Sequence, residues 1–440
     1  MSIEFNIAMG RARSRPTLSR LLAGLLMVAP IAGARLAEGS TKPLPQVWLP
    51  AGIPEAPAEG PALCQRDFLT PEQGAAVLTA ALQAFPDCEA WEAYADRVRE
   101  RIQEGAGLAP WPKRTPLKPI VRDRRLFDGY SVENVAFESV PGFFAAGNLY
   151  RPLDAAPPHA AVVSTHGHTR GIKQPADYAN HGRFTENAQK RAAGLARMGA
   201  VVFAIDMFGY GDSIQQVGQE PHKTDLAMTM QVWNAIRAVD FLSSLEDVDS
   251  ARIAVTGESG GGTQAFLLAA LDDRVAVSVP VVMVSSYFFG GCACESGRPI
   301  HRSADHFASN AMIAALAAPR PMLVVSDGKD WTQHVPAVEF PFLQEIYGRF
   351  GARGNVANAH FEAEGHDYGP SKRAAMYRFM AERLELDLQA VQDDAGAIDE
   401  SRLTVEPPEA MRVFIDAESL PAHALRDAAS VSQALKNLQH

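Results

Sequence analysis

The chain lacks an excess of basic residues, internal repeats and, outside its N-terminal end, any long apolar run. Its 440 residues include 41 Lys and Arg against 51 Asp and Glu, which gives a formal net charge of −10 at pH 7. Because no cluster of basic residues follows the N-terminal end, the charge argues against a nucleic-acid-binding protein. No later segment approaches the roughly 20 apolar residues that a membrane-spanning helix needs. The 47% hydrophobic content is enough for one large core.

Cysteine is also scarce, with four residues in the chain. Cys64 and Cys88 flank a predicted helix and are candidates for a disulfide in an oxidising compartment. Cys292 and Cys294 are too close in sequence for an easy mutual disulfide, and cross-pairing of the two regions stays open. Their Cys-x-Cys-Glu segment resembles one corner of a metal site, but no matching second pair accompanies it. We therefore expect no zinc site, no other metal and no organic cofactor.

The N-terminal end has the pattern of an export signal. Four arginines between positions 11 and 20 precede an apolar stretch over residues 21–34, which ends in Ala-Gly-Ala. A basic region, a short apolar region and a small-residue site together predict a signal peptide over residues 1–34, and hence a secreted or periplasmic protein. An uncleaved membrane anchor is the alternative.

The rest of the sequence divides into three predicted parts. Residues 35–125 combine a linker rich in Pro, Gly and Ala with a helical cap, whose helices are expected over residues 71–85 and 89–103. Between residues 126 and 386, apolar strands alternate with helices. This pattern predicts an α/β fold with a mostly parallel central sheet and helices on both faces. Residues 387–440 form a C-terminal extension, to which the sequence assigns no function.

The most informative segment is Gly257-Glu258-Ser259-Gly260-Gly261. The apolar run before it predicts a buried strand, and the residues after it predict a helix. A serine between glycines at such a junction is typical of a nucleophile elbow, because small residues let strand and helix approach and leave the hydroxyl exposed. Ser259 is therefore the predicted nucleophile, and an ordinary loop of small residues is the alternative.

A catalytic acid and a histidine are expected downstream, in that order. The strand-like run 321–325 is followed by a turn that holds Asp327 and Asp330. Asp330 lies just past the strand end and is the preferred acid, with Asp327 as its rival. His366 stands in a glycine-bounded loop after the strand-like segment 356–362. It is the preferred base, which would take the Ser259 proton while Asp330 fixes its tautomer.

A third segment, His166-Gly167-His168, follows the apolar run 160–165. In many α/β-hydrolases the turn at this position supplies one backbone N–H of the oxyanion hole. The predicted donors are therefore the N–H groups of His168 and Gly260. A plain loop with two surface histidines is the alternative.

On these motifs the chain resembles the α/β-hydrolase superfamily, and within it the secreted acetyl xylan esterase-like and dienelactone-hydrolase-like carboxylesterases. The resemblance covers about residues 126–386 and implies Ser259 as nucleophile, Asp330 as acid and His366 as base. It also places the Cys292 segment near the mouth of the pocket. The segments that carry it are residues 165–168, 206–213, 257–262, 290–295, 327–332 and 364–369.

These observations predict a serine-dependent carboxylic-ester hydrolase that works through an acyl-enzyme, with a small-molecule or carbohydrate ester as substrate. Removal of acetyl groups from plant polysaccharide is the substrate class that the resemblance favours. A serine peptidase or amidase of the prolyl-oligopeptidase-like type is one alternative, and a non-catalytic binding protein on a hydrolase scaffold is another. Aromatic residues in the strand-end loops either line the pocket or pack in the core: Tyr287, Phe288, Phe289 and Trp331. Asp206 and Asp212 are expected to be structural.

Overall fold

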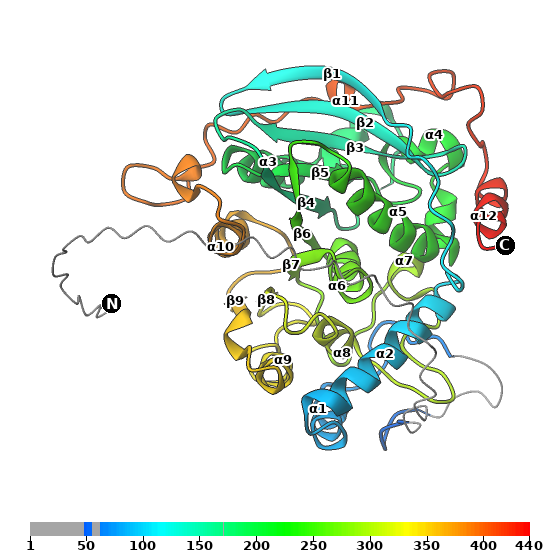
Figure 1. The fold of residues 1–440 in the computed structure, drawn as a ribbon, viewed down its shortest axis with the longest axis vertical. Coiled ribbons are helices and arrows are strands. Elements are labelled where there is room, and N and C mark those ends of the chain that lie inside the picture. The colour runs from blue at the N-terminus through cyan, green and yellow to red at the C-terminus, as the bar shows by residue number, and fades with distance from the viewer. Residues whose placement is uncertain (1–47, 55–61, 170) are drawn as a thin grey trace, which may run out of the picture. The chain divides into compact units, whose positions relative to one another are not determined.

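A nine-stranded sheet runs through the described part of the chain, residues 48–54, 62–169 and 171–440 of the computed structural model (Figure 1). Its strand order is β1-β2-β3-β5-β4-β6-β7-β8-β9. The first three strands and β5 pair in antiparallel fashion, whereas the strands from β5 to β9 are parallel. The strands are β1 (Ile120–Phe127), β2 (Tyr130–Val140), β3 (Phe143–Pro152), β4 (His159–Thr165), β5 (Val201–Ile205), β6 (Val248–Glu258), β7 (Val275–Val281), β8 (Met322–Asp327) and β9 (Val356–Phe361).

Helices cover both faces of this sheet. One core cluster joins the sheet to α5, α6, α8 and α9, and a second joins its other face to α3 and α10. The predicted mostly parallel α/β fold is thus confirmed. The helices are α1 (Pro71–Ala84), α2 (Cys88–Gly105), α3 (Glu186–Arg197), α4 (Ile214–Val217), α5 (Leu226–Ser243), α6 (Gly260–Leu271), α7 (Ala293–Ser296), α8 (Asn310–Ala315), α9 (Glu339–Arg349), α10 (Pro370–Leu384), α11 (Pro408–Met411) and α12 (Ala428–Asn437).

The central strands are apolar and inaccessible. Every residue of β4 and β5 is buried, as expected for parallel strands with helices on both sides. Because parallel strands all end at the same edge, the loops after β4, β6, β8 and β9 gather there. All the predicted site residues belong to those loops.

The first two helices begin at well-formed caps. Thr70 and Gln73 form a reciprocal capping box at the start of α1, and the Asp87 side chain caps α2. The pair packs beside α9, where the ring centroids of Trp91 and Phe342 are 6.1 Å apart. Both helices lie where the sequence predicts them, within residues 71–105.

The C-terminal extension returns across the antiparallel end of the sheet. Buried Val413 and Phe414 form a small core with β2 and β3, and the ring centroids of Phe414 and Phe144 are 5.8 Å apart. Asn148 of β3 donates a hydrogen bond of 2.9 Å to the carbonyl of Met411. The extension therefore adds a small apolar core to this end of the sheet.

No helix within the described ranges has both the length and the apolar character needed to cross a bilayer. The predicted signal peptide, residues 1–34, lies outside the described residues.

Candidate active site

Three parallel strands deliver the three predicted catalytic side chains to one edge of the sheet. Ser259 follows β6 directly, Asp330 follows β8 by three residues, and His366 follows β9 by five residues. Their arrival at the same edge is a consequence of the parallel topology.

Ser259 has the strained backbone of a nucleophile elbow, with φ 56° and ψ −123°. The glycines around it have no room for a side chain. A Cβ at position 257 would lie 2.0 Å from Thr165 Oγ1, and a Cβ at position 261 would lie 2.7 Å from the carbonyl oxygen of His166. The small residues therefore allow the β4 loop, the end of β6 and the start of α6 to meet at Ser259.

Asp330 and His366 form a tight pair. Asp330 Oδ2 lies 2.6 Å from His366 Nδ1. The other carboxylate oxygen accepts hydrogen bonds from the Thr332 N–H at 2.5 Å and the Thr332 hydroxyl at 2.6 Å. These contacts orient the carboxylate toward the imidazole and leave His366 Nε2 as the basic nitrogen.

The rival acid, Asp327, has a different partner. Its side chain is fully buried and forms a salt bridge of 3.1 Å with Lys372 on α10. Lys372 also donates a hydrogen bond to the Gly365 carbonyl, next to His366. Asp327 therefore supports the histidine loop through Lys372, whereas Asp330 contacts the imidazole itself.

The contact between the nucleophilic serine and the histidine is the weakest link of the predicted triad. No hydrogen bond links the Ser259 hydroxyl to His366 among those of the described residues. Catalytic hydrogen bonds in unliganded hydrolases are often long and tighten when substrate binds. On its other side the imidazole contacts Trp331, with ring centroids 4.5 Å apart, and Trp331 stacks on Phe288 at 3.9 Å.

The predicted oxyanion donors lie against the elbow. Gly260 begins α6, so its N–H has no acceptor inside the helix. A Cβ on Gly167 would lie 3.2 Å from the Ser259 Cβ, and the His168 ring lies 2.6 Å from the position that a Cβ of Gly260 would take. The structure thus brings the segment 166–168 and the start of α6 together beside the serine.

Two supporting residues were missed from the sequence. Buried Arg191 on α3 forms a salt bridge of 2.7 Å with Glu258 and donates to the Thr165 carbonyl at 2.8 Å. The Thr165 hydroxyl donates to the Gly261 carbonyl at 2.8 Å. Both residues connect the ends of β4 and β6 and so fix the segment 166–168 relative to the serine. Arg191 lies outside every motif, whereas Thr165 belongs to the segment 165–168, whose pattern assigns no role to its side chain.

Nearby polar residues are structural. His166 is buried, which lowers its pKa well below the ordinary value, and its Nε2 accepts a hydrogen bond from the Met207 N–H at 3.2 Å. Asp206 and Asp212 both pair with buried Arg183. Burial raises the pKa of Asp206 to about 7 despite the opposing charge of Arg183. The two aspartates thus hold a turn, as predicted.

Comparison with known proteins identifies the family. A family model described as "Acetyl xylan esterase (AXE1)" matches residues 125–289. The solved structure of "Methylesterase BT1017" is 41% identical, with a TM-score of 0.75, and the match covers 86% of this chain and 82% of that one. This chain belongs to the same family of esterases as that methylesterase. A Bacillus subtilis (strain 168) protein, "Putative hydrolase YtaP", is 28% identical over 201 residues, which are 42% of this chain and 63% of that protein.

Membership of this esterase family confirms the predicted superfamily and the class of carboxylic-ester hydrolase. The chain spans less than two thirds of the length of YtaP.

The loop after β4 in this esterase borders two cavities of mixed polar and apolar lining. One, of about 390 Å³, is lined by residues that include Thr169, Lys173, Tyr210 and Gln219. The other, of about 720 Å³, shares Thr169 and Lys173 with it. Both therefore begin one residue beyond His168, and their linings offer several hydrogen-bonding groups.

The predicted aromatic residues divide between two roles. Tyr287, Phe288 and Phe289 are buried and belong to the core, whereas Trp331 is half-buried and contacts His366. Core packing thus accounts for the first three. Trp331 is the member of the group that lies at the candidate site.

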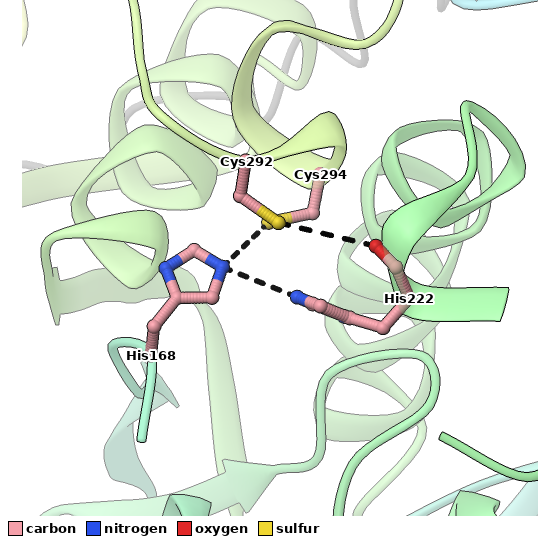
Figure 2. Close-up of side chains that lie close together, drawn as sticks. All are labelled: His168, His222, Cys292 and Cys294. Carbon is pink, nitrogen blue, oxygen red and sulfur yellow. Dashed lines mark hydrogen bonds between the residues drawn. The ribbon is translucent and has the colours of Figure 1, made fainter. Parts of the chain in front are cut away.

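The esterase also brings together four side chains that the sequence analysis separated. His168, His222, Cys292 and Cys294 converge, with their potential ligand atoms all within 4.8 Å of one another (Figure 2). The expectation that Cys292 and Cys294 have no matching second pair is therefore wrong: the second pair is two histidines from distant loops. All four cysteines are free thiols, so the candidate disulfide between Cys64 and Cys88 is not formed.

Proposed function

We propose that the chain is a serine-dependent hydrolase of polysaccharide esters that works through an acyl-enzyme. The observation that carries this proposal is the 2.6 Å hydrogen bond between Asp330 and His366, at the sheet edge where Ser259 occupies its strained turn. Ser259 Oγ attacks the ester carbonyl while His366 accepts its proton. The N–H groups of Gly260 and His168 stabilise the oxyanion.

The first half of the reaction ends when the protonated His366 donates its proton to the departing alcohol. Asp330 stabilises the imidazolium until then. The second half repeats these roles with water. Water, deprotonated by the same histidine, then attacks the acyl-serine and frees the enzyme. Each proton moves between His366 and an oxygen, so the cycle balances without another reactant.

A carbohydrate ester is favoured over a purely apolar one by the surroundings of the oxyanion segment. Lys173 lines both cavities beyond His168, and the larger cavity adds the side chains of Asp177 and Asn180. Such groups lose hydrogen bonds to water when an apolar ligand covers them, whereas sugar hydroxyls replace those bonds. A saccharide is therefore the ligand for which this lining is suited.

Two ester classes deserve separate tests. The family model is named for acetyl xylan esterase, whereas the more extensive likeness is to a methylesterase. In an acetyl ester the saccharide is the leaving alcohol, and the acyl-enzyme carries only acetate. In a methyl ester the saccharide carries the carbonyl and stays attached to Ser259 after methanol departs. The likeness over 86% of the chain favours the methyl ester.

The test is product release from acetylated xylan and from a methyl-esterified polyuronate, with peptide nitroanilides as a third substrate. Ser259→Ala should lose at least about 10⁴-fold in kcat and should no longer react with a fluorophosphonate. Ser250→Ala is the matched control, because Ser250 is an exposed serine at the other end of β6. Retained turnover in Ser259→Ala would refute the nucleophile, and cleavage of nitroanilides alone would move the activity to the peptidase class.

We also propose that the protein is exported, on the basis of the basic and apolar pattern in residues 1–34. Expression of the full chain in a Gram-negative host, followed by cell fractionation and mass measurement, tests this. A mature protein that begins near residue 35 and appears outside the cytoplasm is expected. A full-length cytoplasmic product would contradict it.

A further inference from the structure

Four metal-binding side chains meet beside the candidate active site. They come from three loops that lie far apart in sequence: His168 follows β4, His222 lies in the 3-10 turn Glu220–Lys223, and Cys292 and Cys294 stand at the start of α7. His168 Nε2 is 3.1 Å from His222 Nε2 and 2.9 Å from Cys294 Sγ. Figure 2 shows the two rings and the two sulfur atoms turned toward a common point.

The hydrogen bonds around the two rings direct lone pairs at that point. His222 Nδ1 lies 2.7 Å from the Phe208 carbonyl oxygen, so Nδ1 carries the proton and Nε2 presents its lone pair. His168 Nδ1 lies 3.5 Å from Glu295 Oε1, which favours a proton on that nitrogen as well. Both Nε2 atoms then face each other as electron-pair donors. Such an arrangement is suited to a cation between them.

The spacing agrees with a tetrahedral ion. Zinc–nitrogen bonds of about 2.0–2.1 Å and zinc–sulfur bonds of about 2.3 Å place neighbouring ligand atoms roughly 3.3–3.8 Å apart. The observed distances from His168 Nε2 are shorter: 3.1 Å to the other nitrogen, by about 0.2 Å, and 2.9 Å to the sulfur, by about 0.6 Å. Small side-chain rotations would therefore open the cluster to an ion of this size.

The surroundings resemble the outer shell of a metal site. Metal-bound histidines usually donate their second ring N–H to a carbonyl or a carboxylate, and here Phe208 and Glu295 occupy those positions. The Glu295 carboxylate is itself fixed, since Oε2 accepts from the N–H groups of Gly291 at 2.8 Å and Cys292 at 3.0 Å.

We propose that His168, His222, Cys292 and Cys294 bind one Zn²⁺ ion in a closed, structural Cys₂His₂ site. Two thiolates balance the charge of the ion, and the mixed sulfur and nitrogen donors suit zinc better than calcium or magnesium. Because the protein supplies four ligands, no position stays open for a catalytic water. The role of the ion is to fasten the loop after β4 to the loops that follow β5 and β7.

Metal content of the full-length protein tests this directly. The chain is purified under reducing conditions without chelator, incubated with zinc chloride, passed through gel filtration and analysed by mass spectrometry of its metals. About one tightly held zinc ion per chain is expected. His222→Ala and Cys294→Ser should lose it, and Cys88→Ser, which changes a cysteine at the start of α2, should keep it. Metal content requires no turnover, so this result is independent of the proposed esterase activity.

Two measurements on the wild-type protein test the same site without any substitution, and so do not depend on the folding of a variant. Replacement of zinc by Co²⁺ should give the intense visible absorption of tetrahedral thiolate-bound cobalt. Because Cys64 is buried in any case, the informative thiol count is the increase of two that react with Ellman's reagent once a chelator is added. Three outcomes would overturn the proposal: no zinc in the wild type, full zinc content in both ligand variants, or an intact-mass loss of two hydrogens that maps to a Cys292–Cys294 disulfide in the reduced preparation.

Discussion

The assignment of Asp330 as the catalytic acid makes a sharp prediction for Asp330→Asn. The carboxylate uses one oxygen for Thr332, as acceptor from both the N–H and the hydroxyl, and the other for His366. In the asparagine variant the carbonyl oxygen satisfies the two Thr332 donors. The amide NH₂ is then the group that faces His366 Nδ1.

This change reverses the tautomer of the histidine. The NH₂ group takes the place of Oδ2, which lies 2.6 Å from Nδ1, and it can only donate a hydrogen bond. Nδ1 must therefore give up its proton, and Nε2 must carry one. The nitrogen that should deprotonate Ser259 is then no longer basic. The same change in a serine protease triad costs about 10⁴-fold in kcat, which corresponds to roughly 5.5 kcal/mol of transition-state stabilisation. We expect a loss of this order with little change in stability.

Asp327→Asn is the matched control. Asp327 is also an aspartate and lies three residues before Asp330, at the end of β8. Its partner, however, is the buried Lys372. Its replacement should lower the free energy of unfolding, since Lys372 loses a buried partner, while kcat per folded molecule falls by no more than about 10-fold. The assay is nitrophenyl acetate turnover combined with urea unfolding. A larger kcat loss in Asp327→Asn than in Asp330→Asn would refute the assignment.

Two further substitutions test the supports of the site. Gly261→Ala would place a Cβ 2.7 Å from the backbone carbonyl of His166, and we expect kcat to fall by about 10²-fold because the oxyanion segment must shift; unchanged turnover would contradict the close approach. Arg183→Met would leave buried Asp206 without its cation and Asp212 with Arg412 alone, so urea unfolding should show a loss of about 3–5 kcal/mol in the free energy of unfolding. A loss near zero would exclude a structural role for the Arg183 ion pairs.

Local patterns made the elbow and its partners predictable. The strand, the glycine turn and the helix around Ser259 are consecutive in residues 248–271. Each of the other two candidates follows a strand, which is buried before Asp330 and mixed in character before His366. Parallel strands deliver their carboxyl ends to one edge, so position after a strand is enough to bring Ser259, Asp330 and His366 to one region. The choice between Asp330 and Asp327 depends on side-chain direction, which the structure supplies through Thr332 and Lys372.

Other parts of the fold carry no comparable local signal. Strand β1 has a polar sequence, and most of its residues are exposed at the edge of the sheet, so it shows no apolar alternation. The C-terminal extension packs Val413 and Phe414 on the sheet from irregular backbone, which has no period to detect. The metal cluster combines His168 with Cys294, 126 positions away. Only the tertiary fold makes such pairs neighbours.

Under the two proposals, the loop after β4 has two roles, because the backbone and the side chain of His168 have different partners. Its backbone is the proposed oxyanion donor, whose position must be held to about 0.5 Å. Hydrogen bonds of Thr165 and His166 hold the start of this loop, and beyond His168 the chain borders two cavities. The His168 imidazole lies against Gly260 and ends among His222 and the two cysteines. Anchoring that ring at the cluster is therefore the most direct way to hold the N–H in place while the neighbouring cavities stay open to substrate.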